Sequence, residues 1–456
     1  MVGITKMKAE KQKAEKEAFF CTTKELSRLG LEQIPTQFQS HKHLIYSSPA
    51  TLAFNSPGAE GFGVKRAGLA VPDSIMLIVA PGCCGRNTSL ISSMKEYNDR
   101  FYYLMMDETD IVTGRHLKKI PKAVEEICSV CPKKPSVVMI CITCVDALLG
   151  TDMERVCKKA EEQVEIPVRP CYMYALTREG RKPPMVHVRQ SLYSLLEPGK
   201  KKGNVVNLLG FFSPLVDDCE IYDLLHSAGV KTIHEISRCK DYMEYQTMSE
   251  ANFNLVLHHE ARFAAEDFHN RLQIPFIELR RLYQIDKIEN QYHALGNALG
   301  VAFYDEKYKK QAEDALEKFR QRCPDASFAI GECLNADPFE LSLALIRYGF
   351  SVPEIYGTIT VENFTYIRSL AKISPETKVF SNMEPTMIYY DPAKSDVNLA
   401  IGKDACYYHP DCPYVMWNGE EQPYGYAGVR RLFEQLLEVV SVSYTHLRAH
   451  ETSLHL

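Results

Sequence analysis

The chain has 456 residues, enough for roughly three domains of ordinary size. Apolar residues make up 45% of it and charged residues 24%, and 53 basic against 58 acidic side chains leave a formal charge of −5. This composition is typical of a globular protein and excludes a strongly basic nucleic-acid-binding surface.

The most apolar runs, 74–84 and 136–145, are shorter than the roughly 20 residues that a bilayer-spanning helix needs. The N-terminus also lacks the apolar core of a signal peptide. We therefore expect a cytoplasmic protein with neither membrane nor nucleic-acid partners. Its cysteine count, 15, is odd, which favours free thiols or metal ligands over disulfides in that compartment.

Short apolar runs alternate with helix-like segments from about residue 47 onward, as in parallel sheets covered by helices. Ahead of them, residues 1–46 are expected to form an N-terminal helical arm. The first α/β domain is predicted over 47–203 and ends at a Pro/Gly/Lys-rich linker, 197–204. Its expected strands are 75–79, 102–105 and 137–141. Its expected helices are 121–131 and 152–162.

Two further units repeat this alternation, so the predicted fold is α/β, with three tandem Rossmann-like domains whose parallel sheets surround a central cleft. The second domain is expected over 204–325 and the third over 326–440. Their expected elements are strands at 205–210, 253–257, 327–332, 378–380 and 397–401, helices at 222–228 and 261–273, and a long helical segment over 285–322. Residues 441–456 change composition abruptly and are interpreted as a non-native tail without functional ligands.

Two cysteine-containing turns carry the clearest chemical signal. Cys83 and Cys84 follow the first expected strand, and Cys141 and Cys144 lie at the end of the third. Thiols at a strand-to-helix turn lie near a positive helix N-terminus, which favours the metal-binding thiolate. Because ligands of open α/β sheets bind at the carboxyl edge, we expect both turns to meet there. Buried structural cysteines and a zinc or redox C-x-x-C pair remain alternatives.

The order and spacing of several motifs resemble the nitrogenase component 1 superfamily. This superfamily includes the nitrogenase α and β subunits, dark-operative protochlorophyllide reductase and nickel-sirohydrochlorin reductive cyclase. The resemblance covers about residues 50–440 and implies the same three-domain architecture. The motifs that carry it are 73–84, 144–152, 206–210, 254–256 with 274–277, and 424–428.

In that superfamily, cysteines from two subunits hold an iron–sulfur cluster at the subunit interface. The resemblance places two such ligands at Cys84 and Cys144, with Cys83 and Cys141 as neighbours that could replace or join them. The family's first cluster cysteine has no counterpart near 56–58, which argues against an eight-iron cluster. Two thiolates from each of two subunits would complete a [4Fe–4S] cluster. The alternative is one chain that supplies all four thiolates.

The resemblance also implies a cavity between the domains for a second metallocofactor of unknown type or an organic substrate. The two residues that anchor the nitrogenase cofactor fall at His258 and Tyr424, so both ligands have changed and dinitrogen fixation is not expected. His258 and His259 follow an apolar strand and are candidate catalytic proton donors. Hydrogen-bonded core histidines are the alternative for both.

Two other groups are candidates for binding a ligand. Arg262, Arg280 and Arg281 could bind substrate carboxylates, and solvated surface arginines are the alternative. Segment 406–412 holds two cysteines and a histidine at a spacing that also occurs in metal sites.

The chain contains neither a G-x-x-x-x-G-K-[ST] phosphate loop nor a G-x-G-x-x-G fingerprint, so we expect neither ATP hydrolysis nor direct NAD(P)H oxidation. By resemblance, electrons would come from a separate ATP-dependent iron–sulfur reductase. The leading prediction is a nitrogenase-like oxidoreductase subunit, in a homodimer or with a sister component 1 subunit. It would relay low-potential electrons through the interface cluster to a substrate in the cleft. The alternatives are a metallocofactor-assembly scaffold and a partner subunit that lends only interface and cluster ligands.

Overall fold

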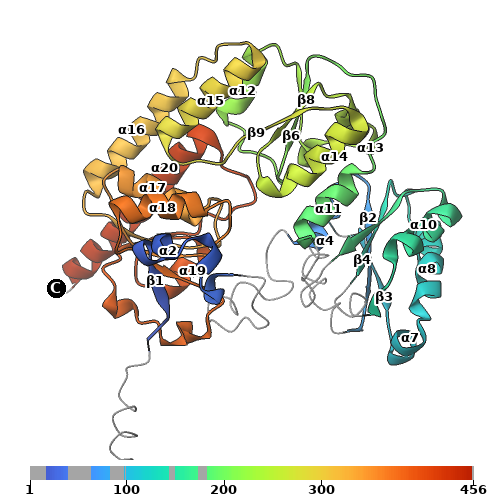
Figure 1. Ribbon diagram of the computed structural model, residues 1–456, viewed down its shortest axis with the longest axis horizontal. Coiled ribbons are helices and arrows are strands. Elements are labelled where there is room, and N and C mark those ends of the chain that lie inside the picture. Colours follow the sequence, from blue (N-terminus) through green and yellow to red (C-terminus); the bar gives the residue numbers. More distant parts are fainter. Residues whose placement is uncertain are drawn as a thin grey trace, which may run out of the picture.

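The computed structural model describes residues 17–39, 63–82, 97, 99–142, 149–172 and 182–453, apart from the side chains of 64, 142 and 442–453. Three lobes follow one another along the chain, each with its own sheet (Figure 1). Within the described residues, the strands of each sheet pair in parallel except at one N-terminal strand. The prediction of three tandem Rossmann-like domains is confirmed.

The first lobe is a four-stranded sheet whose central strands are buried. The strand order is β3 (Phe101–Met105), β2 (Ile75–Ala80), β4 (Val138–Ile142) and β5 (Val168–Tyr172). All six residues of β2 are buried, as its uninterrupted apolar sequence predicts. The helices are α4 (Val64–Ala67), α7 (Glu108–Thr113), α8 (His116–Val130), α10 (Met153–Val164) and α11 (Pro184–Tyr193).

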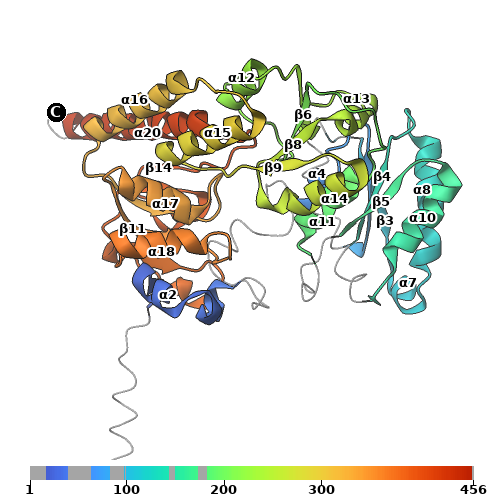
Figure 2. The same cartoon turned by 45° about the horizontal axis from the view of Figure 1, so that its top comes forward.

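The second lobe also has four parallel strands, and it lies between the other two lobes (Figure 2). Their order is β7 (Thr232–His234), β6 (Val205–Leu209), β8 (Phe253–Val256) and β9 (Phe276–Glu278). The helices are α12 (Glu220–Ser227), α13 (Tyr242–Gln246) and α14 (Arg262–Leu272). One buried apolar cluster joins residues of the first and second lobes, and another joins the second and third, so the three lobes form one packed body.

The third lobe has six strands, and alternate residues of its central strand face two different apolar clusters. Phe328 and Ile330 of β10 pack against the large helix-covered core, whereas Ala329 packs on the opposite side. The strand order is β1 (Phe20–Thr22), β12 (Lys378–Phe380), β11 (Ser351–Tyr356), β10 (Ser327–Ile330), β13 (Leu399–Ile401) and β14 (Tyr414–Val415). The helices are α2 (Thr23–Leu29), α15 (Ile285–Leu299), α16 (Glu306–Arg322), α17 (Pro338–Arg347), α18 (Phe364–Ile373), α19 (Lys403–Tyr408) and α20 (Gly425–Ser453).

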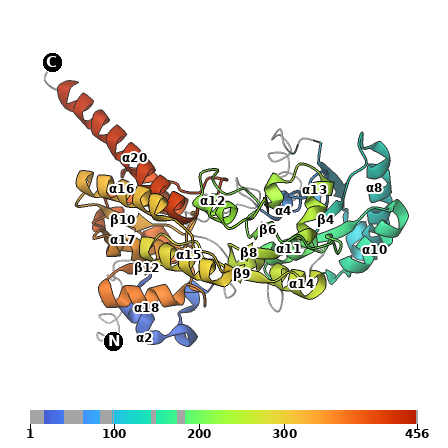
Figure 3. The same cartoon turned by 90° about the horizontal axis from the view of Figure 1, so that it is seen from above.

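Two features differ from the elements expected in the sequence. The helical segment 285–322 is two helices, because Gly300 adopts a left-handed conformation, with φ of 69°, and ends α15. Residues 17–39 also contribute a strand: β1 pairs antiparallel with β12, and α2 packs on α18. Helix α20 runs beside α16 and extends beyond the body of the protein (Figure 3). None of the helices in the described residues combines the length and the hydrophobicity needed to cross a bilayer.

A buried carboxylate connects the second lobe to the third. Glu340 of α17 is completely buried, and it accepts hydrogen bonds from the backbone N–H of Tyr283 at 2.9 Å and from the side chain of Gln284 at 3.0 Å. Burial raises the pKa of Glu340 to about 7, although these hydrogen bonds lower it in part. The folded protein therefore binds a proton at Glu340 more tightly than the unfolded chain does.

This raised pKa predicts a pH dependence of stability. The contribution of Glu340 is fully present below its ordinary pKa of 4.5 and is lost as the pH rises through about 7. Between about pH 5 and about pH 8, we expect the wild-type free energy of unfolding to fall by on the order of 2 kcal/mol more than that of Glu340→Gln. Urea unfolding of both proteins at each pH checks this, and equal pH slopes would contradict it.

Candidate functional site

A cavity of about 370 Å³ lies between the second and third lobes, and its volume is within the range of ligand sites. Most of residues 256–262 and 278–281, which follow or end the parallel strands β8 and β9, line one side. Residues 334–338, which lead into α17, line the other side. The cavity therefore lies at the carboxyl end of a parallel sheet, where open α/β folds bind their ligands.

The sequence-predicted histidines both line this cavity. The rings of His258 and His259 stack with their centroids 4.5 Å apart, and Phe211 packs edge-on against His258 at 5.7 Å. Burial lowers the pKa of His258 well below its usual value, and the charges of Arg189, His259 and Arg281 lower it further. His258 is therefore neutral at pH 7, and a neutral imidazole is a good ligand for transition metals.

The two ring nitrogens of His258 have different surroundings. Nδ1 accepts a 3.4 Å hydrogen bond from the backbone N–H of Glu260, and a carboxylate oxygen of Glu260 lies 3.8 Å away. Nε2 makes no hydrogen bond to the described residues, and 33% of the side chain is exposed. A ring nitrogen that accepts a hydrogen bond carries no proton, so the proton of this neutral imidazole is on Nε2. In this tautomer Nε2 is a hydrogen-bond donor, and it becomes a possible metal ligand only when the proton moves to Nδ1, beside the carboxylate of Glu260.

Ion pairs neutralise two arginines of the cavity. Arg262, predicted to bind a cofactor, donates to both carboxylate oxygens of Glu278, at 2.6 and 2.8 Å. Arg189 donates to Glu260 at 2.8 Å and to the backbone of Gly210. These pairs fix the walls of the cavity. Because the charge of Arg262 is already paired, it is not the cation that a bound anion would meet first.

Other residues singled out in the sequence lie away from the cavity. Tyr424 is 1% exposed, and its hydroxyl donates to the backbone carbonyl of Arg280 at 3.1 Å, outside the cavity lining. In segment 406–412 the two thiols point to different backbone carbonyls, and His409 bonds Glu354 at 3.2 Å. Among the residues that the structure describes, no group of three or more Cys, His, Asp or Glu side chains could hold a metal ion.

The strands that precede the two cysteine turns are neighbours. Val79 of β2 lies opposite Ile142 of β4, so both turns start at the same sheet edge. Cys83, Cys84 and Cys144 themselves lie outside the described residues. Cys141 is completely buried opposite Cys171 of β5, in the core that the first two lobes share. Burial in this core favours a structural role for Cys141.

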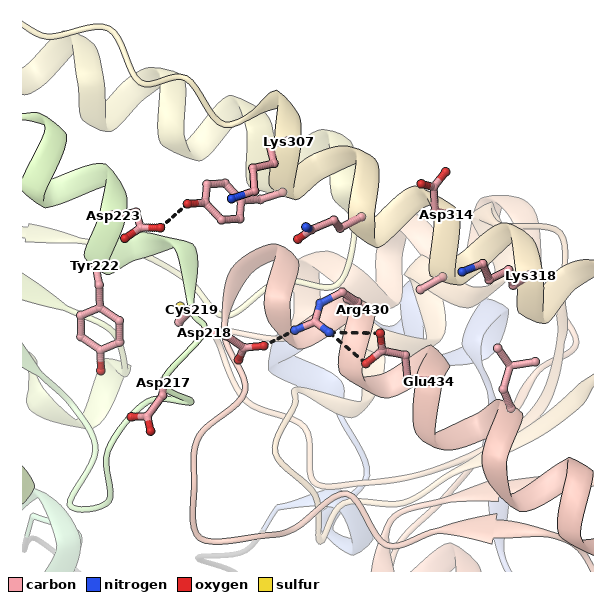
Figure 4. Close-up of a pocket in the computed structure, with 14 residues that line it drawn as sticks. Asp217, Asp218, Cys219, Tyr222, Asp223, Lys307, Asp314, Lys318, Arg430 and Glu434 are labelled. Atoms are coloured by element: carbon pink, nitrogen blue, oxygen red, sulfur yellow. Dashed lines mark hydrogen bonds and ion pairs between the residues drawn. The ribbon is translucent and has the colours of Figure 1, made fainter.

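A second hollow, of about 600 Å³, lies on the surface between α12, α16 and α20 (Figure 4). Charged side chains of both signs line it and contact one another. Arg430 pairs with Asp218 and with Glu434, the latter at 3.0 Å, and the hydroxyl of Tyr308 donates to Asp223. No histidine is among its described lining residues. Because Arg430 is already paired with carboxylates and no histidine is among these residues, the cavity around His258 is the better candidate site.

Several residues of the site were not singled out in the sequence. Asp337 lines the cavity and caps α17, accepting hydrogen bonds from the backbone N–H of Phe339 and Glu340 at 2.9 and 3.0 Å. Burial raises its pKa to about 6. An Asp-Pro pair before an apolar run is a helix N-cap signal that could have identified it. Phe211 and Gln422 carry no comparable local signal.

The chain is similar to proteins of one family in sequence and in fold. The family model described as "Nitrogenase component 1 type Oxidoreductase" matches residues 60–441. A protein of Sinorhizobium fredii named "Nitrogenase iron-molybdenum cofactor biosynthesis protein NifE" is 25% identical over 418 residues, covering 86% of this chain and 82% of that protein. The NifE protein of Mesorhizobium japonicum is 24% identical, with the same coverage of both chains.

The solved structures show the same fold. "Nitrogenase Cp1 at pH 6.5" superposes with a TM-score of 0.68 at 18% sequence identity, covering 88% of this chain and 93% of that one. "Nitrogenase Cp1 at pH 5" gives 0.63 at 15% identity, covering 96% of each chain. At such low identities the likeness concerns the fold alone.

The names of the curated relatives overturn the leading functional prediction. An oxidoreductase that relays electrons to a substrate was expected, but these relatives are named for cofactor biosynthesis. Burial and the nearby cationic groups lower the pKa of His258, which disfavours the imidazolium form that a general acid needs at neutral pH. The electron relay, and with it the ATP-dependent reductase as its electron donor, is therefore not retained.

Proposed function

Because this chain belongs to the family of nitrogenase component 1 type oxidoreductases, we propose that it is a scaffold on which a metallocofactor is assembled. The cargo would be a metal–sulfur cofactor or its precursor, held in the cavity around His258. One observation carries the proposal: a neutral imidazole faces an interlobe cavity in a chain whose relatives are named for cofactor biosynthesis.

The residues of the cavity suit a cargo that is held and then released. His258 would bind a metal of the cargo through Nε2 after its proton moves to Nδ1, beside the carboxylate of Glu260. His259, stacked on His258, is a second imidazole within the same cavity. No cysteine is among the described residues that line the cavity, and we propose imidazole as the anchor. Few protein ligands favour release, which a scaffold requires and a permanent cofactor site does not.

We further propose that Cys84 and Cys144 bind a [4Fe–4S] cluster together with the same pair from a second subunit. The partner would be another copy of this chain or a sister subunit of the family. The adjacency of β2 and β4 supports this proposal, because it brings the beginnings of both turns to one sheet edge. This cluster is distinct from the cargo around His258.

The scaffold proposal is tested by the stoichiometry of transfer. Full-length protein, isolated without oxygen and loaded with iron and sulfide, should pass its cargo to a metal-free acceptor protein once and then stop. His258→Ala should retain the cavity-bound metal at least about tenfold more weakly. His293→Ala, an exposed histidine of α15 outside the cavity, should behave as the wild type. Metal analysis after gel filtration measures retention.

Two results would count against this function. One is equal metal retention by His258→Ala and the wild type. The other is repeated reduction of a substrate by the loaded protein, since a scaffold yields one transfer for each cargo bound.

A further inference from the structure

Arg281 is a cation of the cavity that has no carboxylate partner among the described residues. Its guanidinium lies over the ring of Phe211, with Cζ 4.4 Å from the ring centroid. One N–H group on Nη2 donates to the side-chain oxygen of Gln422 at 2.6 Å. Its Nε is shielded from solvent and has no hydrogen-bond partner. Buried donors of this kind are rare, because an unsatisfied donor costs free energy.

Arg189, a buried arginine of the same cavity, has a carboxylate partner. Arg189 donates to the carboxylate of Glu260 as well as to backbone carbonyls. Arg281 has only a neutral amide and an aromatic face, although an arginine keeps its charge in proteins. This end of the cavity therefore carries an uncompensated positive charge, where a negative group would gain most.

The guanidinium is held in position by three chain segments. Phe211 follows β6, Arg281 follows β9, and Gln422 precedes α20. The backbone of Gln422 is itself fixed: it donates to Pro214 at 2.9 Å and accepts from Val216 at 3.1 Å. A cation oriented before its ligand arrives loses little side-chain freedom on binding.

We propose that Arg281 is the anion-binding group of this cavity and that the ligand held there carries an oxyanion. A carboxylate and an inorganic oxyanion share this chemistry, since both present oxygens that the planar guanidinium can bind through two parallel N–H groups. The inference rests on the proposed function, because both concern the same cavity. It adds that the ligand must be negatively charged at one end: His258 would bind its metal, and Arg281 would bind its oxyanion.

The test measures binding of citrate and of inorganic phosphate to the metal-free full-length protein by titration calorimetry. Arg281→Gln should weaken binding by about tenfold or more, because a charge-assisted hydrogen bond is lost. Arg281→Lys keeps the charge without the planar fork and should bind with intermediate strength. Arg368→Gln is the matched control, since Arg368 also lies over an aromatic ring, Phe364 at 5.0 Å, but outside the cavity. It should bind as the wild type.

The two anions separate the sources of the oxyanion. Binding of citrate alone supports a carboxylate ligand, and binding of phosphate alone supports an inorganic one. The proposal is overturned if the wild type binds neither anion, or if folded Arg281→Gln and Arg281→Lys both bind as tightly as the wild type. Anion binding requires no metal, so its failure is distinguishable from a failure of metal retention at His258.

Discussion

Substitution of Gly425 by alanine is expected to lower the free energy of unfolding by about 3 to 5 kcal/mol. Gly425 begins α20 with φ of 57°, in the left-handed region that other residues rarely adopt. An added Cβ would overlap a carboxylate oxygen of Glu220 and the hydroxyl of Tyr292, and would lie 2.9 Å from Cδ of Glu220. Both side chains are buried and hydrogen-bonded to each other, so neither can move aside freely.

The measurement uses the single tryptophan of the chain. Trp417 is 7% exposed within the apolar core of the second and third lobes, and its fluorescence should report the unfolding of that region in urea. Gly419→Ala is the control, because its Cβ would meet nothing within 4 Å. We expect it to change stability by less than about 0.5 kcal/mol. Equal unfolding midpoints for the two variants would contradict the steric argument.

The reason for this sensitivity is a carboxylate that caps α20 from another lobe. Glu220 of α12 accepts hydrogen bonds from the backbone N–H of Tyr426 at 2.6 Å and of Ala427 at 3.0 Å. It also accepts from the hydroxyl of Tyr292 at 2.6 Å. These donors compensate the desolvation of a buried carboxyl group, and the helix dipole favours negative charge at that end. The close approach to Gly425 is therefore part of the connection between the second lobe and α20.

Apolar periodicity in the sequence predicts strands that are apolar throughout, such as β2 and β4, or that contain a single asparagine, such as β6 and β8. Strands with polar residues or proline were missed: β5 contains Arg169 and Pro170, and β11 contains Pro353 and Glu354. In the structure, Glu354 is buried because His409, 55 residues away, bonds its carboxylate at 3.2 Å. A local pattern cannot reveal a partner at that separation.

Partners that are distant in the sequence also limit what can be predicted about the candidate site. The histidine pair was located from the sequence because residues after a parallel strand lie at the ligand-binding edge. The ion pairs and pKa shifts of the site could not be predicted from the position of residues along the sequence. The pairing of Arg262 with Glu278 joins α14 to β9. The low pKa of His258 depends first on its burial in the folded chain and then on Arg189 and Arg281, which come from separate segments. These interactions neutralise Arg262 and leave Arg281 without a carboxylate partner among the described residues.

Replacement of either proposed cluster ligand by alanine, Cys84→Ala or Cys144→Ala, is expected to abolish the interface cluster. A [4Fe–4S] cluster needs four ligands, so losing one cysteine from each of two identical subunits leaves only two thiolates. Cys128→Ala is the matched control, because this cysteine lies on α8, in another part of the lobe. Electron paramagnetic resonance of reduced protein kept free of oxygen should show a cluster signal in Cys128→Ala and none in the other two.

The iron content then distinguishes the two ligand arrangements. For protein without cargo, a cluster shared by two copies of the chain gives about two iron atoms per chain, whereas a cluster held by one chain gives about four. Sharing also predicts that each cysteine variant loses the cluster and weakens association of the two copies, which sedimentation measures. A cluster held by one chain would leave association unchanged. A normal resonance signal in both Cys84→Ala and Cys144→Ala would refute the ligand assignment, while the scaffold role of the cavity around His258 would stand on its own test.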